Sequence, residues 1–174
     1  ENSVLSIKNR SFTVTAEIDV PVGGAQGVVI AQGGRFGGWS VPLHEGRPTF
    51  CYNVLGIQIF TVRADDPVPG GVHQVRAMFA YDGGGLAKGG DVSLFVDGAA
   101  AGSGRVEMTQ PLIFSADETT DIGRDEGTPV SPDHTGPTSR FTGRIHWVQL
   151  DVGEDDHGHF LDPEERLRVA IARQ

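Results

Sequence analysis

The chain has 174 residues, enough for one domain with a sizeable core, and its length gives no reason to expect two domains. Its 23 acidic residues against 14 Lys and Arg give a formal net charge of −9, which argues against nucleic acid and anionic membranes as partners. The single cysteine, Cys51, excludes an internal disulfide framework, and the sequence has no Cys/His spacing of the zinc type and no long apolar run. The opening residues, ENSVLSIKNRS, predict a start within a longer protein.

The first predicted element is a half-buried strand over residues 11–21, SFTVTAEIDVP. Every second residue is apolar, as in a strand with one face on a core: Phe12, Val14, Ala16, Ile18 and Val20. Glu17 and Asp19 lie on the opposite face, and we interpret them as the solvated face of an edge or outer strand.

The next stretch, residues 27–40, reads GVVIAQGGRFGGWS and suggests either a phosphate-binding loop or a bend between two strands. A phosphate-binding loop needs a Lys followed by Ser or Thr at the start of a helix, and no Lys follows Gly38. Residues 33–38 also fail the G-x-G-x-x-G pattern in every register. The glycines therefore predict a tight bend between strands, with Arg35 and Phe36 at its tip.

Further strands are predicted as far as residue 152. One begins at Trp39 and turns at Glu45-Gly46, and Pro42 within it is typical of an edge strand or of an unpaired ladder position. The other predicted strands are residues 50–52, 57–62 and 73–81, a hairpin over 91–106 that turns at Asp97-Gly98, and residues 143–152. Residues 115–140 are rich in Asp, Thr, Ser, Pro and Gly without periodicity, which predicts a loop region.

The hydrophobic period changes only at the C-terminus. Asp162 is a predicted N-cap, followed by Pro163 and by Glu165 three residues after the cap. This pattern predicts a short amphipathic helix over residues 162–174, whose apolar face is Leu167, Ala170 and Ile171, after an acidic linker over residues 153–161. With strands over about residues 4–152 before it, the sequence predicts a mainly β, antiparallel two-sheet β-sandwich, as a single domain over residues 1–174.

Six segments carry a family resemblance: NRSFTVTAEIDVP, GVVIAQGGRFGGWS, FAYDGGGLAKGG with VSLFVDG, FSADETTDIGRDEGTPVS, FTGRIHWVQLDV and DPEERLRVAIARQ. Together they resemble the C-terminal domain of large bacterial arylsulfatases, along nearly the whole chain. The strand-DG-strand hairpin and the I-G-R…F-T-G-R-I pattern are also similar to laminin-G and concanavalin-A-like jelly rolls.

The arylsulfatase resemblance implies a division of labour within a larger polypeptide. A preceding N-terminal sulfatase domain would hydrolyse sulfate esters with a formylglycine nucleophile and a divalent metal. This chain would be its accessory domain, supporting domain packing or substrate access, with no cofactor of its own except a calcium ion as an alternative. The resemblance leaves both the bacterial cytoplasm and the cell envelope open as the compartment.

The residues predict that the chain itself is not an enzyme. The sulfatase nucleophile lies in a C/S-x-P-x-R segment, whereas residues 51–55 lack both the Pro and the Arg. The nearest match, residues 135–139, starts with Thr and ends with Ser139 where the Arg is required. Glu17 and Asp19 also begin the E-x-D-x-x-E pattern of jelly-roll glycoside hydrolases, but Val22 occupies the place of the second Glu.

Two acidic segments offer candidate metal ligands. Oxygen ligands of the kind that Ca²⁺ requires gather in the predicted loop: Asp117, Asp121 and Asp125, with Glu118 and Glu126 nearby. Their order does not fit an EF-hand, which favours a solvated acidic loop over a calcium site. A mixed oxygen and imidazole site at Asp155, Asp156, His157 and His159 is an alternative to a simple polar linker.

Aromatic residues offer a third kind of site. Four of them fall in or beside predicted strands: Trp39, Tyr52, Tyr81 and Trp147. In a carbohydrate-binding laminin-G-like module they would line one concave sheet face and stack on sugar rings. The alternative, which strand alternation favours, is that they belong to the core.

Overall fold

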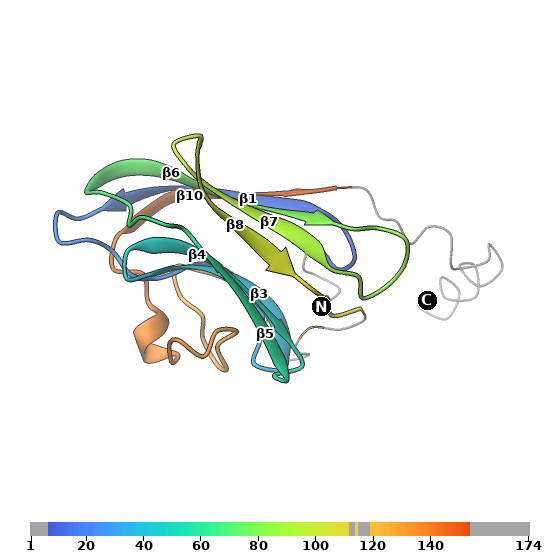
Figure 1. Cartoon of the computed structure of the whole chain (residues 1–174). Helices are drawn as coiled ribbons and strands as arrows, with labels where there is room; N and C mark the ends of the chain where they lie inside the picture. Colours follow the sequence, from blue (N-terminus) through green and yellow to red (C-terminus); the bar gives the residue numbers. More distant parts are fainter. Residues whose placement is uncertain (1–6, 112–113, 115–118, 154–174) are drawn as a thin grey trace, which may run out of the picture.

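The computed structural model describes residues 7–111, 114 and 119–153, which form two antiparallel five-stranded sheets packed face to face (Figure 1). Sheet A has the order β10 (Arg144–Val152), β1 (Phe12–Val20), β6 (Gly71–Tyr81), β7 (Gly90–Val96) and β8 (Ala99–Val106). Sheet B has the order β5 (Gln58–Arg63), β4 (Arg47–Val54), β3 (Gly37–His44), β2 (Gly27–Gly34) and β9 (Thr120–Ile122). The mainly β, two-sheet prediction is confirmed for these residues.

Helical structure in the described residues is limited to one 3₁₀ turn, η1 (Pro137–Ser139). It lies in the segment that the sequence predicted as a loop, together with the short strand β9. The predicted helix over 162–174 lies outside the described residues, as does the acidic linker apart from Gly153. None of the described helical structure is long and apolar enough to cross a membrane.

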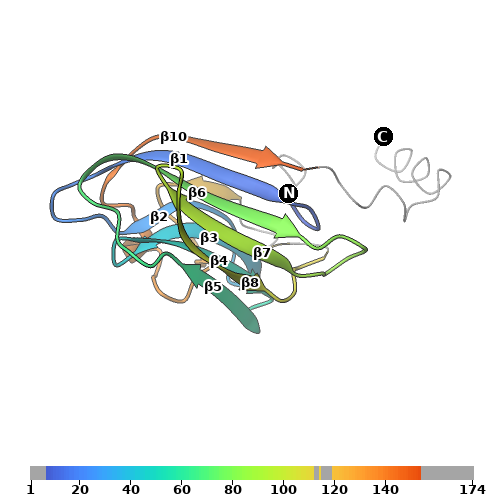
Figure 2. The same ribbon diagram turned by 45° about the horizontal axis from the view of Figure 1, so that its top comes forward.

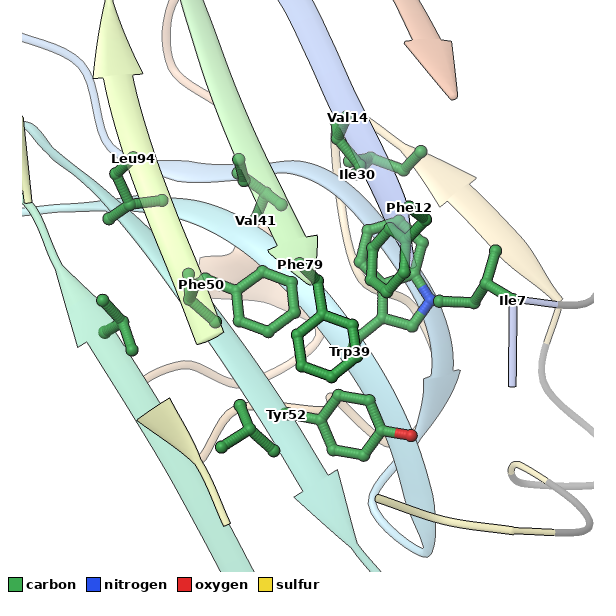
Figure 3. Close-up of a cluster of buried hydrophobic side chains, with 14 of the residues drawn as sticks. Ile7, Phe12, Val14, Ile30, Trp39, Val41, Phe50, Tyr52, Phe79 and Leu94 are labelled. Carbon is green, nitrogen blue, oxygen red and sulfur yellow. The ribbon is translucent and has the colours of Figure 1, made fainter. Parts of the chain in front are cut away.

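Aromatic rings from both sheets meet in the core between the sheets, among a larger number of aliphatic side chains (Figure 3). The ring centroid of Phe12 lies 5.0 Å from that of Trp39 and 5.5 Å from that of Phe79. Phe50 and Phe79 stack with centroids 6.1 Å apart, so rings from the two sheets meet across the interior. Each such pair contributes about 0.5–1.5 kcal/mol beyond the area it buries. All five apolar residues predicted for the inner face of β1 are buried in this interior.

The bend predicted at GGRFGG is confirmed. β2 ends at Gly34 and β3 begins at Gly37, so Arg35 and Phe36 form the exposed tip of a hairpin. Gly33 has φ +82°, and a Cβ there would collide with the carbonyl oxygen of Gly37. A residue with a side chain would therefore be strained at this position, both by the positive φ and by the close approach of the backbone.

Pro42 corrects one part of the sequence prediction. It does not lie on an edge, because β3 is the middle strand of sheet B. The register with β2 shifts opposite Pro42, between Val28 and Ile30, and pairing with β4 passes from Ser40 to Leu43. Pro42, which cannot donate to the ladder, keeps Val28 of β2 as its register partner and has none in β4, so the unpaired ladder position is correct for the β4 side alone.

Sheet B is covered on both faces. Its inner face packs on sheet A, and residues 123–139, which we call the cover segment, lie against its outer face, below the sheet in Figure 1. Val130 of the cover segment packs with residues that point away from the interior: Val28, Ala31 and Cys51. As a result β2, β3 and β4 are buried along almost their whole length.

Sheet A keeps its outer face open. Figure 2 shows β10, β1 and β6 side by side, with no described segment lying across them. Burial accordingly alternates along β6, where Val75, Ala77 and Phe79 are buried and the residues between them are exposed. The open face holds Glu17 and Asp19, and β1 is an inner strand of the sheet, so the edge-strand alternative for these two residues is wrong.

Candidate functional site

The open face of sheet A gathers polar side chains from three neighbouring strands. Thr15 of β1 lies opposite Arg76 of β6 and Gln149 of β10. One row away, Thr13 lies between Met78 and Asp151. These residues share a shallow depression of about 360 Å³, lined by Thr13, Thr15, Gln74, Arg76, Met78, Trp147, Gln149 and Asp151. We call this depression the sheet A site.

Trp147 is the aromatic residue of the sheet A site, and the residue is 39% exposed. Its position depends on a bulge in β10. Ile145 pairs with Ile18 and Trp147 with Glu17, which leaves His146 as an extra residue in the strand. Ile145 and Val148 can therefore both pack on the core, while Trp147 faces outward with Gln149 and Asp151.

The polar groups of the sheet A site combine donors and acceptors. The Gln149 amide nitrogen donates to both carboxylate oxygens of Asp151, at 2.9 Å each, which orients the carboxylate on the edge strand. Arg76 supplies a guanidinium two strands away, and strand spacing puts its backbone about 10 Å from that of Gln149. The site therefore offers one apolar ring face, a positive group and a negative group on a flat, solvated surface.

The other three predicted aromatics take structural roles. Trp39 is fully buried and its indole nitrogen donates to Gln32 at 2.9 Å. Tyr52 is also buried, and burial raises the pKa of its phenol well above the ordinary value. Tyr81 is half-buried, and its hydroxyl donates to the Gly85 carbonyl and accepts from the Lys88 amide. The core interpretation is thus correct for Trp39 and Tyr52, whereas Trp147 lies outside the core.

The predicted calcium ligands are only partly described. Asp117 lies outside the described residues, as do Glu118 and the Asp155–His159 group. Asp121 accepts from the Glu126 amide at 3.0 Å. Asp125 is buried and accepts from the Val130 amide at 2.9 Å, so both carboxylates hydrogen-bond to backbone amides of their own loop. Within the described part of the chain no three His, Cys, Asp or Glu side chains group as metal ligands, and calcium binding stays a prediction.

Cys51, at the start of the segment compared with the sulfatase nucleophile, is buried beneath the cover segment. Burial raises the pKa of its thiol to about 12, so the thiol stays protonated at neutral pH and is a poor nucleophile. Ser139, at the end of the second segment compared, is also fully buried and exchanges hydrogen bonds with the backbone of Asp125. Both side chains are therefore enclosed within the fold.

Sequence reasoning singled out Trp147 but missed the polar residues around it. The strand over 143–152 alternates, so Gln149 and Asp151 could have been assigned to the face of Trp147. Thr15 and Arg76 could not have been assigned to this site from the sequence, because their positions depend on β10 and β6 both pairing with β1. Such pairing between distant segments leaves no local signal in a single sequence.

Comparison with known proteins gives likenesses in structure alone. No protein-family model matches the chain, and no curated protein matches its sequence. Domains LG4–5 of the mouse laminin α1 chain superpose with a TM-score of 0.58 at 14% identity, over 86% of this chain and 38% of that one. A SAP-like pentraxin from Limulus polyphemus superposes with a TM-score of 0.51 at 13% identity, over 85% of this chain and 67% of the pentraxin chain. The binding domain of botulinum neurotoxin serotype D superposes with a TM-score of 0.53 at 12% identity, over 95% of this chain and 38% of the neurotoxin chain.

At these identities the likenesses establish the fold and no more. The chain spans well under half of the laminin chain that it matches. None of the three structures is an arylsulfatase, so that part of the resemblance stays a proposal. The two five-stranded sheets and these neighbours together show that the chain has the laminin-G-like, concanavalin-A-like jelly-roll fold.

Proposed function

We propose that this chain is a non-catalytic, laminin-G-like binding module that binds a carbohydrate on the open face of sheet A. The observation that carries the proposal is the exposed indole of Trp147 within a depression lined by polar side chains. Trp147 belongs to none of the buried hydrophobic clusters of the described residues. The combination of one aromatic ring with a few placed polar groups is typical of sites that bind small molecules.

The chemistry of the site suits a sugar. A pyranose ring has an apolar C–H face that would pack on the indole of Trp147, and it has hydroxyls at its rim. Asp151 accepts hydrogen bonds from hydroxyls, and its orientation by Gln149 reduces the entropy lost on binding. Arg76 and Gln74 supply donors on the far side of Thr15 and Glu17. The flat face also leaves room for a chain of sugars to extend across the strands.

We further propose, from the sequence resemblance, that the parent protein is an arylsulfatase. In that setting the module would hold a sulfated glycan near a preceding catalytic domain, which would carry the formylglycine and the divalent metal. A C/S-x-P-x-R segment upstream of Glu1 in the parent sequence would support this parentage. If the parent sequence lacks this segment, the arylsulfatase parentage is contradicted, and the carbohydrate proposal is unaffected. The chain alone should leave an aryl sulfate unhydrolysed, and turnover that persists through purification would contradict its non-catalytic role.

Affinity electrophoresis tests the carbohydrate proposal. The chain would be run through gels that contain one of a panel of neutral and acidic polysaccharides. We expect at least one polysaccharide to retard the wild type. Trp147→Ala should weaken that binding by about thirtyfold, the effect of losing roughly 2 kcal/mol at a binding hot spot. Because Trp147 is exposed, the variant should keep the thermal stability of the wild type.

A matched control uses an exposed aromatic on the other sheet. Phe36 lies at the tip of the β2–β3 hairpin and is 64% exposed, and Phe36→Ala should leave polysaccharide binding unchanged. No retardation by any polysaccharide, or equal losses from Trp147→Ala and Phe36→Ala, would contradict the proposal.

A further inference from the structure

A second depression lies on the opposite side of the molecule from the sheet A site. It has a volume of about 510 Å³, within the range of small-molecule sites. The cover segment forms one wall, and the tips of the β2–β3 and β4–β5 hairpins form the other, with Arg35, Asn53, Gly56 and Ile59. We call it the cover pocket. It shares no residue with the sheet A site, so its ligand is independent of the proposed carbohydrate.

Most polar groups that line the cover pocket are already used by the fold. Asn53 donates to the Val130 carbonyl at 2.9 Å and accepts from the Gly56 amide at 2.8 Å. Ser131 accepts from the Asp133 amide at 3.2 Å, and the hydroxyls of Thr135 and Thr138 lie 3.1 Å apart. These groups hold the walls in place. They have little remaining capacity to bind a ligand.

Arg35 and His134 are the two exceptions. The Arg35 backbone amide donates to the Thr128 carbonyl at 3.0 Å, which anchors the residue at the pocket. Its guanidinium makes no ion pair with the described carboxylates. The His134 side chain is only 9% exposed, and its buried Nε2 has no hydrogen-bond partner. Nε2 lies 3.6 Å from the Asp125 carboxylate, whose Oδ1 is likewise without a partner.

The rest of the pocket wall is largely apolar. Ile59, Pro129 and Pro132 contribute hydrocarbon surface to the pocket that Arg35 also lines. A ligand that matches both features has an apolar body and one negative charge. The chain's net charge of −9 opposes the approach of an anion, so binding would depend on the local guanidinium and on the apolar wall.

We propose that the cover pocket binds a small organic anion, an aryl or alkyl carboxylate, with the anion on Arg35 and the apolar body against the prolines and Ile59. His134 also lines the pocket, but its Nε2 is buried and faces Asp125, so the charge that holds the anion comes from Arg35. A guanidinium and a carboxylate form charge-assisted, often bidentate hydrogen bonds, which makes Arg35 the main determinant of affinity. The binding site is formed by a segment that the fold itself needs as a cover for sheet B.

NMR titration of the ¹⁵N-labelled chain tests this proposal with phenylacetate and hexanoate as probes. We expect both to shift the backbone amides of Gly127, Thr128 and Gly136 and to leave the strands of sheet A unmoved. Phenylacetamide, which has the same apolar body without the charge, should bind about tenfold more weakly or worse. Arg35→Gln should weaken phenylacetate binding by about ten- to hundredfold.

The matched control is Arg76→Gln, which removes an exposed arginine from the sheet A site. Both variants should keep the wild-type melting temperature, because both side chains are exposed. The proposal is wrong if neither probe shifts the pocket amides up to its solubility limit. It is also wrong if phenylacetamide binds as well as phenylacetate, or if the two arginine variants bind phenylacetate equally.

Discussion

The outer faces of the two sheets differ in what the chain does with them. On sheet B the chain returns to cover the face itself, and Val130 packs with outward residues of β2 and β4, among them Cys51. On sheet A the outward residues of β1, β6 and β10 are polar and stay in solvent around Trp147. A sandwich needs only its inner faces to form a core. The covered face therefore adds stability, and the open face is available for recognition.

The sharpest test of this difference introduces a charge on each face. Val130→Asp would place an unpaired carboxylate between the cover segment and sheet B, at a residue that is fully buried. We expect it to lower the free energy of unfolding by about 3 kcal/mol or more. Met78→Asp, on the open face of sheet A, should change it by only about 0.5 kcal/mol. Urea unfolding curves measure both values, and similar losses would show that the two faces do not differ.

A smaller effect is expected from releasing one attachment of the cover segment. Asn53→Ala removes the donor to the Val130 carbonyl and the acceptor for the Gly56 amide, and leaves the buried carbonyl unpaired. The free energy of unfolding should fall by about 1–3 kcal/mol. Gln149→Ala on sheet A, which removes a hydrogen bond between exposed groups, is the control and should have almost no effect.

The same variant should expose Cys51, which the cover segment buries. With its thiol pKa raised to about 12, Cys51 should react very slowly with a thiol reagent at neutral pH in the native chain. Asn53→Ala should accelerate the reaction, because it makes local opening of the cover segment easier. An unchanged rate would mean that the hydrogen bonds of Asn53 do not control access to Cys51.

The smallest effect concerns a hydrogen bond at the β7–β8 turn of sheet A. His73 lies 2.7 Å from the Asp97 carboxylate, and this bond, with a second from the Gln74 amide, holds the pKa of Asp97 below its ordinary value. A lowered pKa in the folded state means that the stabilisation is present above the unfolded pKa of about 3.9 and is lost as the pH falls through the folded value. Asp97 is largely exposed, so the contribution is small.

Asp97→Asn should therefore flatten the loss of stability below about pH 4, with little change at pH 7 beyond the small lost contribution. Thermal melts of the wild type and the variant from pH 7 to pH 3 measure the difference. A steeper acid loss in Asp97→Asn than in the wild type would contradict the assignment.

The contrast between the faces also explains how far the sequence could predict this molecule. The strands were visible because residues such as Val14 and Val75 alternate with polar ones, and the bend at Arg35 and Phe36 was visible from its glycines. The covering of sheet B could not be predicted from the sequence, since residues 115–140 have no periodicity that would mark Val130 as buried. Its burial depends on contact with distant strands, which a single sequence does not encode locally.

The same reason limited the prediction of the sites. The exposure of Trp147 depends on the bulge at His146, and its polar neighbours come from strands that are far apart in the sequence. The cover pocket combines Arg35 with His134, which are almost a hundred residues apart and share no motif. In both sites the fold brings together side chains from distant segments. The residue types alone suggested only a core aromatic residue and a polar loop.

The central claim is that the open face of sheet A binds the carbohydrate, and the two tryptophans allow it to be tested directly. Each gives one indole N–H signal in a ¹H–¹⁵N NMR spectrum. Titration with a fragment of the polysaccharide that retards the chain should shift the signal of exposed Trp147 and leave that of buried Trp39 in place, since Trp39 is already bonded to Gln32. Shifts confined to sheet B, with the Trp147 indole signal unmoved at saturation, would contradict the account.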